Sequence, residues 1–300
     1  MLDGIIPAMN IPFDENDKVD YDSLRNEVVN GIDAGVVGFM VPVFASEVCN
    51  LHPEEKEKIV EIVVETTEGS VPVIGGATSE NLNESLYLAD SYMKRGCKGV
   101  LCSIPYVNNK QYKRYARDLA SLEPEFLMIQ DWAPGDYGVP SELIVELFDE
   151  LECFRCLKIE VVPSGPKYTE ILIKTNGRLC VSGGWSVSQM IEGLDRGVHA
   201  FAVTGMMEIY CRIFNLYQQG NRKGAKYLFE KLLPAIVFAN QHLDISIWFY
   251  KRLMWKQGLY KTPNVRMPIM NFDDYHRRVA DENIDLVISL TKIITSCPEY

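Results

Sequence analysis

The sequence lacks long hydrophobic runs, a leader pattern and clustered metal-binding residues. No window approaches about 18 apolar residues free of charge, so we expect no membrane-spanning helix. Residues 1–13 have no basic start, long apolar stretch or small-residue cleavage site, so we expect no signal peptide. We interpret the scattered histidines as structural or surface residues and expect no metal site, because their spacing is not that of metal ligands. They are His52, His199, His242 and His276.

The cysteine content and the balance of charge exclude further classes of protein. Eight cysteines in 300 residues, without the spacing of small disulfide-linked domains, indicate reduced thiols and a cytoplasmic protein. Cys153 and Cys156 form one Cys-x-x-Cys motif without a second pair for zinc, and we interpret it as structural. With 30 basic and 41 acidic residues the formal net charge is −11, and no basic stripe is present. We therefore expect neither nucleic acid nor membranes as partners.

What the chain does have is a regular alternation of short apolar runs and longer amphipathic patterns. Eight runs predict strands, at residues 4–9, 38–43, 71–75, 99–103, 126–130, 156–160, 179–182 and 200–204. Helical patterns lie between them, for example at 53–67, 82–95 and 141–151. Repeated strand–helix units predict a parallel sheet, and eight units predict a closed (β/α)8 barrel of the α/β class. A doubly wound sheet is the alternative, but its Gly-x-Gly-x-x-Gly turn after the first strand is missing.

The strand patterns stop after Thr204, which indicates a change of architecture near the C-terminus. Helical patterns follow at 223–238, 245–257 and 273–294. We therefore predict a barrel in residues 1–220 and a C-terminal helical extension in residues 221–300.

The predicted sixth strand carries two charges inside an otherwise apolar run, Lys158 and Glu160. Side chains alternate along a strand, so these two share one face and can pair. A desolvated lysine with a lowered pKa is a neutral amine that can attack a carbonyl group. A structural ion pair explains the same pattern, and this strand alone does not decide between the two.

Other polar residues interrupt apolar runs at the carboxyl ends of strands, where barrel enzymes place their sites. Ser46 and Glu47 follow the second strand, where a hydroxyl and backbone N–H groups can hold a carboxylate, although Ser-Glu at a helix start is also a common cap. Gln130 and Asp131 end the fifth strand, and Asp131 is either an acid–base group or a turn residue.

Glycines follow the seventh and eighth strands, at Gly183-Gly184 and after Thr204 at Gly205. Glycine lets backbone approach a ligand closely, and barrels often bind phosphate at these two loops. A phosphate-binding barrel enzyme without a covalent lysine is therefore a rival hypothesis.

Taken in order and spacing, these pieces resemble the dihydrodipicolinate synthase and N-acetylneuraminate lyase family over almost the whole chain. The resemblance rests on Pro12-Phe13, the segment from Val43 to Glu47, Pro105-Tyr106, Lys158, Ser182-Gly183 and the tail motif from Val265 to Pro268. It implies that Lys158 forms a Schiff base with pyruvate or a related 2-oxo acid. It also implies that Ala45 and Ser46 hold the substrate carboxylate and that no metal or organic cofactor is required. The same resemblance implies a homo-oligomer, commonly a tetramer.

Departures from the family pattern fall on the residues that relay protons. Counting back from Pro134, the usual strand-five tyrosine is replaced by Asp131, a second tyrosine by Val107 and a threonine by Ala45. The arginine that grips a distal carboxylate has no counterpart in residues 135–139. We therefore expect that the protein is not an efficient dihydrodipicolinate synthase.

Within this divergent site, Asp131 and Glu160 are the expected proton-transfer groups, and Tyr106 or Tyr137 could substitute for the missing tyrosine. Substrate contacts are expected from Ala45, Ser46, Glu47, Tyr106, Gln130, Gly183, Gly184 and Thr204. The leading hypothesis is an aldolase or dehydratase for a 2-oxo or hydroxylated, sugar-derived acid. A relative that binds 2-oxo acids without turnover is the remaining alternative.

Overall fold

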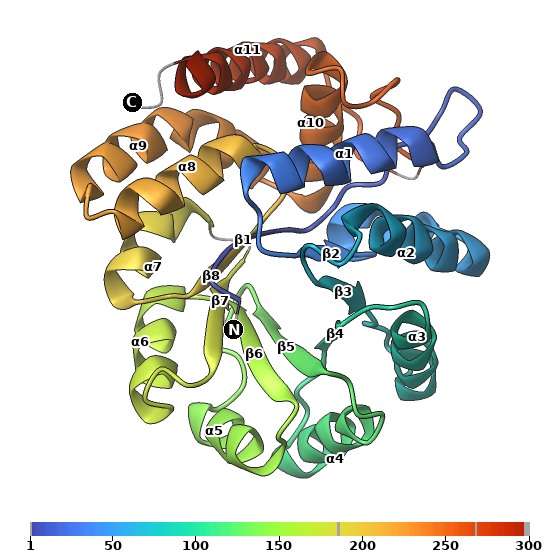
Figure 1. The fold of residues 1–300 in the computed structure, drawn as a ribbon, viewed down its shortest axis with the longest axis vertical. Coiled ribbons are helices and arrows are strands. Elements are labelled where there is room, and N and C mark those ends of the chain that lie inside the picture. The colour runs from blue at the N-terminus through green and yellow to red at the C-terminus, as the bar shows by residue number, and fades with distance from the viewer. Residues whose placement is uncertain (1, 185–186, 268, 297–300) are drawn as a thin grey trace.

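Eight parallel strands form one barrel in the computed structural model, which describes residues 2–184, 187–267 and 269–296 (Figure 1). The strands are β1 (Gly4–Pro7), β2 (Phe39–Val41), β3 (Val73–Gly76), β4 (Gly99–Ser103), β5 (Phe126–Ala133), β6 (Phe154–Val161), β7 (Cys180–Gly183) and β8 (Ala200–Val203). From β2 to β8 each strand pairs with the next, β8 pairs with β1, and an isolated bridge between Ala8 and Met40 links the ends of β1 and β2. The predicted (β/α)8 barrel is confirmed.

Helices surround the sheet and follow the strands in turn. Those of the repeating units are α1 (Tyr21–Ala34), α2 (Pro53–Thr67), α3 (Leu82–Lys94), α4 (Asn109–Ala120), α5 (Ser141–Glu150), α6 (Ser164–Lys174), α7 (Met190–Arg196) and α8 (Met207–Gln218). Local sequence fixes several boundaries. The Asp20 side chain accepts hydrogen bonds from the first turn of α1, and Pro53 opens α2, where its missing N–H is no loss.

Three more helices complete the chain: α9 (Arg222–Ala239), α10 (Leu243–Lys256) and α11 (Asp274–Ser296). In Figure 1, α9 lies beside α8, while α10 and α11 close the side of the molecule near α1. The sequence predicted these three helices within a few residues of their bounds, but it did not assign α8. No helix in the described ranges is long and apolar enough to cross a membrane.

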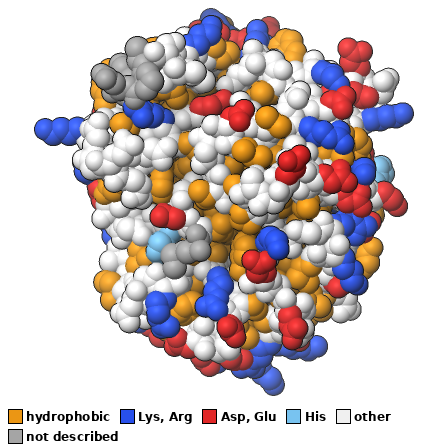
Figure 2. Space-filling view, in the orientation of Figure 1, with side chains coloured by type: hydrophobic (Ala, Val, Ile, Leu, Met, Phe, Trp, Pro, Cys, Tyr) orange, Lys and Arg blue, Asp and Glu red, His pale blue; other side chains and the backbone are white. Residues whose placement is uncertain are grey.

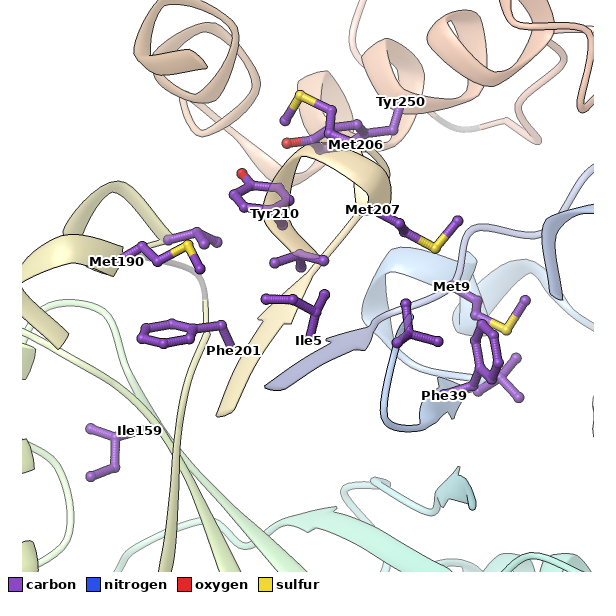
Figure 3. Packing of buried hydrophobic residues seen from close by; sticks show 14 of the residues in the cluster. Ile5, Met9, Phe39, Ile159, Met190, Phe201, Met206, Met207, Tyr210 and Tyr250 are labelled. Atoms are coloured by element: carbon purple, nitrogen blue, oxygen red, sulfur yellow. The ribbon is translucent and has the colours of Figure 1, made fainter. Parts of the chain in front are cut away.

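Two separate hydrophobic layers result from strand alternation. Inside the barrel lie Ile6, Met40, Ile74, Leu101, Met128, Cys156, Cys180 and Ala200 with their neighbours. Between strands and helices lies the larger layer, in which Phe201 of β8 points toward Met190 of α7 (Figure 3). A residue's place in this alternation therefore decides whether it faces the barrel interior or the helices.

Charges of both signs are mixed on one face of the molecule. Figure 2 shows basic and acidic side chains interspersed with hydrophobic ones on the face it presents. This agrees with the absence of a basic stripe from the sequence.

Candidate functional site

Lys158 faces the interior of the barrel. It stands two residues after Cys156, which belongs to the inner layer, and it pairs in register with Gln130 of β5 and Ser182 of β7. Its side chain is buried, with 7% of the residue exposed. Of the two faces that the sequence left open, the structure gives Lys158 the inner one, where barrel enzymes hold their ligands.

Glu160 lies beside the amine on the same face of β6. Its Oε2 is 3.2 Å from the Lys158 Nζ, and it accepts a hydrogen bond from the side-chain amide of Gln130. Gly184 leaves room for this carboxylate, because a Cβ there would lie 2.2 Å from Glu160 Oε1. Lys158, Glu160 and Gln130 thus form one buried polar group, which we call the Lys158 group.

A cavity of about 310 Å³ opens over the Lys158 group, a volume at the small end of the range for ligand pockets. The strand ends contribute Ala8, Gln130, Trp132, Pro134, Lys158, Glu160, Ala202 and Thr204. The short turn after β2 contributes Val43, Phe44 and Ala45, and Val187 follows β7. The C-terminal helices contribute Asn240, Gln241, His242, Leu243, Ser246 and Tyr250. Lys158 therefore lines a cavity that is large enough for a small molecule.

Of the three residues predicted after strand two, Ala45 lines the cavity, while Ser46 and Glu47 do not. The buried Ser46 hydroxyl donates to the carbonyl of Met9 (2.6 Å) and accepts from the N–H of Val43 (2.9 Å). Glu47 has a left-handed backbone conformation, and its carboxylate pairs with Lys251 of α10 and accepts the Arg266 N–H at 2.8 Å. Both side chains hold the loop itself, so the geometry does not support the prediction that they bind substrate.

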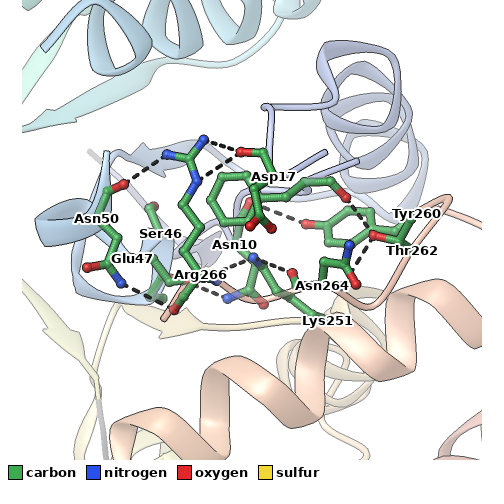
Figure 4. Close-up of polar contacts among 12 residues, drawn as sticks. Asn10, Asp17, Ser46, Glu47, Asn50, Lys251, Tyr260, Thr262, Asn264 and Arg266 are labelled. Carbon is green, nitrogen blue, oxygen red and sulfur yellow. Dashed lines mark hydrogen bonds and ion pairs between the residues drawn. The ribbon is translucent and has the colours of Figure 1, made fainter. Parts of the chain in front are cut away.

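Figure 4 shows the polar network around this loop. Asn10 donates to the carbonyl of Ala45 at 2.7 Å, and the Lys251 Nζ donates to the carbonyl of Asn264 at 2.9 Å. The Tyr260 hydroxyl donates to Glu27 at 2.5 Å. The C-terminal segment is thus tied to the loop that carries Ala45.

Two members of this network have strongly shifted pKa values. Burial lowers the pKa of Lys251 to about 8, although the carboxylate of Glu47 opposes the shift. Burial also raises the pKa of Glu27 to about 8, against the hydrogen bond from Tyr260.

Asp131 lies on the other face of β5 and does not join the Lys158 group. Its neighbour Gln130 pairs in register with Lys158, so alternation turns Asp131 toward the helices. There its Oδ2 is 2.6 Å from the buried Lys167 Nζ, and its Oδ1 accepts the N–H of Val139 at 3.0 Å. Burial raises the pKa of Asp131 despite the adjacent ammonium group. The geometry does not support the prediction that Asp131 transfers protons at Lys158.

The two tyrosines considered as substitutes also lie away from Lys158. Tyr106 is exposed and donates to Asn109 at 2.8 Å, in the wall of a separate cavity of about 940 Å³. The Tyr137 hydroxyl donates to Glu170 at 3.1 Å. Neither residue lines the cavity over Lys158.

Packing contacts account for the glycines in the loops after β7 and β8. Gly184 faces Glu160, and Gly205, with φ of 65°, faces the Tyr250 ring, which a Cβ would approach to 2.7 Å. Gly183 belongs to β7 and packs against Phe201, whereas Thr204 lines the cavity. These contacts explain the glycines without a phosphate.

Sequence reasoning missed the cavity wall built by the chain after residue 239. His242 was interpreted as structural or surface, and it does cap α10, but it also lines the cavity. No local pattern marks residues 240–250 as neighbours of Lys158, because their proximity arises from long-range packing. Trp132 also lines the cavity, and alternation along the strand from Gln130 would have placed it on the inner face.

Comparison with known proteins agrees with this architecture. Residues 1–285 match the model of the dihydrodipicolinate synthetase family. A 4-hydroxy-tetrahydrodipicolinate synthase from Methanococcus maripaludis strain S2 is 33% identical over 238 residues, covering 78% of this chain and 81% of the relative. The enzyme of that name from Campylobacter jejuni is 27% identical over 281 residues, covering 89% and 90%.

Solved structures show the same fold at low sequence identity. The 4-hydroxy-tetrahydrodipicolinate synthase from Methylacidiphilum fumariolicum SolV has a TM-score of 0.87 with 17% identity, and the comparison covers 99% of both chains. The dihydrodipicolinate synthase from Thermotoga maritima also has a TM-score of 0.87, with 19% identity, covering 97% of this chain and 99% of the other.

Proposed function

Because the chain belongs to the dihydrodipicolinate synthetase family, we propose that it is a lyase that forms a Schiff base between Lys158 and pyruvate or another 2-oxo acid. The observation that carries the proposal is the placement of Lys158, a buried primary amine on the inner barrel face that lines a ligand-sized cavity. Such an amine is the group that class I aldolases and related dehydratases require.

The neighbouring carboxylate supplies the proton transfers that this chemistry needs. Glu160, 3.2 Å from the amine, accepts a proton from the Lys158 ammonium, and the neutral amine then attacks the substrate ketone. The resulting carbinolamine loses its hydroxyl as water when Glu160 returns the proton. The iminium product withdraws electrons, so an adjacent carbon–carbon bond or proton can be broken or formed.

The remaining residues divide into substrate contacts and supports. Ala45 brings backbone to the cavity wall, where its N–H can meet the substrate carboxylate, and Gln130 orients Glu160. Asp131 is assigned to the support of the loop after β5 rather than to proton transfer. Residues 135–139 contain no arginine that could bind a distal carboxylate. We therefore propose that the preferred substrate differs from that of dihydrodipicolinate synthase.

Reductive trapping tests the proposal. Incubation with pyruvate or a small set of 2-oxo acids, followed by borohydride, should give a covalent adduct that intact-mass measurement detects. Lys158→Ala should give none, whereas Lys167→Met, which removes another buried lysine, should keep it in the folded fraction. Absence of a wild-type adduct with every acid, or an adduct that survives in Lys158→Ala, would refute a Schiff base at Lys158.

We also propose that the protein works in the cytoplasm as a homo-oligomer, in the manner of the tetramers common in this family. The free thiols of the described cysteines fit a reducing compartment. Light scattering of the purified protein measures the assembly, and a monomer at micromolar concentration would contradict it.

A further inference from the structure

Cys156 belongs to the Cys-x-x-Cys motif of the sequence, but its partner in the structure is Cys180 rather than Cys153. Cys156 lies in the inner layer of the barrel, whereas Cys153 packs against the layer that faces the helices. Cys156, near the start of β6, pairs in register with Cys180, which opens β7. The two Sγ atoms are 3.4 Å apart, and both residues are buried. We call this pair the cross-strand dithiol.

Both thiols of the cross-strand dithiol carry protons. The Cys156 thiol donates a hydrogen bond to the Cys180 Sγ, and the Cys180 thiol donates to the carbonyl of Leu2 at 3.3 Å. Burial raises the pKa of the Cys156 thiol well above its ordinary value. A compound that takes up these sulfurs must therefore also remove two protons.

A cavity of about 760 Å³ leads to the dithiol from the amino-terminal ends of the strands, and Cys156 and Cys180 both line it. This volume is within the range for small-molecule pockets. The apolar side chains that line the cavity and pack against the inner layer are those of Leu2, Val37 and Phe126. The cavity shares no described lining residue with the cavity over Lys158, so the inference below does not depend on the Schiff-base function.

The separation of the two sulfurs indicates which kind of atom they can bind together. One atom with two bonds of about 2.3 Å to sulfur spans 3.4 Å when the bonds meet at roughly a right angle. The pyramidal bonding of trivalent arsenic has such angles, whereas a linear Cu(I) centre would need sulfurs about 4.6 Å apart. Tetrahedral zinc would need two more ligands, and the described residues hold no cluster of three His, Cys, Asp or Glu side chains placed for a metal.

The surroundings of the dithiol favour an uncharged product. Its neighbours in the inner layer include Ile6, Met128 and Ala200, which offer no counter-charge. Cu(I) held by two thiolates would leave one negative charge in this layer, which is costly. An arsenic atom that keeps one organic group and binds two thiolates is neutral.

We propose that Cys156 and Cys180 form a binding site for monosubstituted trivalent arsenic compounds at the amino-terminal mouth of the barrel. With phenylarsine oxide in its hydrated form, two As–O bonds and two S–H bonds break and two As–S bonds form. The two hydroxyl groups leave with the thiol protons as two molecules of water. Arsenic remains trivalent, so the reaction needs no oxidant or reductant, and the phenyl group occupies the apolar cavity.

Titration of the reduced protein with phenylarsine oxide under anaerobic conditions tests the proposal by native intact mass. We expect one phenylarsenic group per chain, which survives excess 2-mercaptoethanol and is removed by 2,3-dimercaptopropanol. Cys156→Ser and Cys180→Ser should each weaken binding by about 10²-fold or more, because the second sulfur binds intramolecularly. Cys153→Ser, which removes the other cysteine of the motif, is the matched control and should bind as the wild type does.

Unchanged affinity in both Cys156→Ser and Cys180→Ser would overturn the proposal, as would loss of binding in Cys153→Ser alone. A second measurement uses the wild-type protein and does not depend on the folding of variants. Anomalous diffraction from crystals treated with phenylarsine oxide should place arsenic within bonding distance of both the Cys156 and Cys180 sulfurs. Arsenic at any other cysteine, with these two sulfurs unoccupied, would refute the assignment.

Discussion

At the residue scale, two buried carboxylates on neighbouring strands have opposite surroundings. Glu160 faces the barrel interior, where Lys158 and Gln130 are its partners. Asp131 faces the helices, where Lys167 and the N–H of Val139 hold it. One residue of register therefore separates a group that can meet substrate from one that supports a loop.

Replacement of Glu160 by Gln should slow both the formation of the trapped adduct and turnover. Glutamine keeps the size of the side chain and can still accept the Gln130 amide, but it cannot carry a proton between amine and carbinolamine. A loss of about 10²- to 10⁴-fold in kcat is expected for a missing general acid–base group. Stopped-flow turnover and intact-mass trapping, measured on the same preparation, check the two halves of the prediction.

Asp131→Asn is the control for that experiment. It should lower the free energy of unfolding by about 3 kcal/mol, because the buried Lys167 ammonium loses its counter-charge. The protein that remains folded should keep its turnover. A large loss of kcat in Asp131→Asn with normal stability would show that Asp131 takes part in proton transfer.

The same two residues show what the sequence could determine about the site. Alternation was enough to pair Lys158 with Glu160. Alternation from Gln130 would also have placed Asp131 on the helix-facing side of β5. The proton-transfer role was instead predicted from the family pattern, in which Asp131 takes the place of the usual tyrosine. The Ser46 hydroxyl was predicted to bind substrate because no local sequence signal reveals its hydrogen bonds with the backbone of Met9 and Val43.

At the element scale, the docking of α10 on the loop after β2 rests on a buried ion pair. Lys251 is fully buried and pairs with Glu47, while Arg266 pairs with Glu55 at 2.7 Å in the same network. This docking fixes Ala45 and the α10 residues of the cavity wall relative to one another.

Lys251→Met should therefore destabilise the protein by about 3 to 5 kcal/mol, since Glu47 would remain buried without its ammonium partner. The double variant Glu47→Gln with Lys251→Met should recover part of this loss. Lys226→Met, in an exposed pair with Glu230, should change stability by about 0.5 kcal/mol or less. Urea unfolding of the variants measures these differences, and equal effects of the buried and exposed changes would contradict the role assigned to Lys251.

The bounds of strands and helices were largely predictable because each arises from local periodicity and end signals. The neighbours of Lys158 from α10 were not, because nothing near residue 240 encodes a contact with β6. Only the packing of α10 against the barrel brings Ser246 and Tyr250 to the cavity over Lys158.

At the scale of the whole molecule, buried ionisable groups make stability depend on pH. The pKa of Glu27 rises from 4.5 to about 8 on folding, so between these values the folded state binds more protons than the unfolded state. Its contribution to stability is therefore full below about pH 4.5 and is lost as pH rises toward 8. Lys251 acts in the opposite sense, because its pKa falls from 10.5 to about 8, so its contribution grows above pH 8.

Glu27→Gln should flatten the decline in stability between about pH 5 and pH 8 by removing this titration. Urea midpoints at several pH values, compared between variant and wild type, test the expectation. If the two proteins lose stability in parallel over that interval, Glu27 does not titrate there.

The part of the cavity wall provided by α10 and the turn before it lies outside the eight strand–helix repeats, and this has an evolutionary consequence. Mutations in a turn that belongs to no strand leave the hydrogen-bonded barrel and Lys158 undisturbed. Natural selection can thus change which metabolite is accepted while the bond-making step is inherited intact. Grafting residues 240–250 from one relative into another offers a compact route to new enzymes on this scaffold.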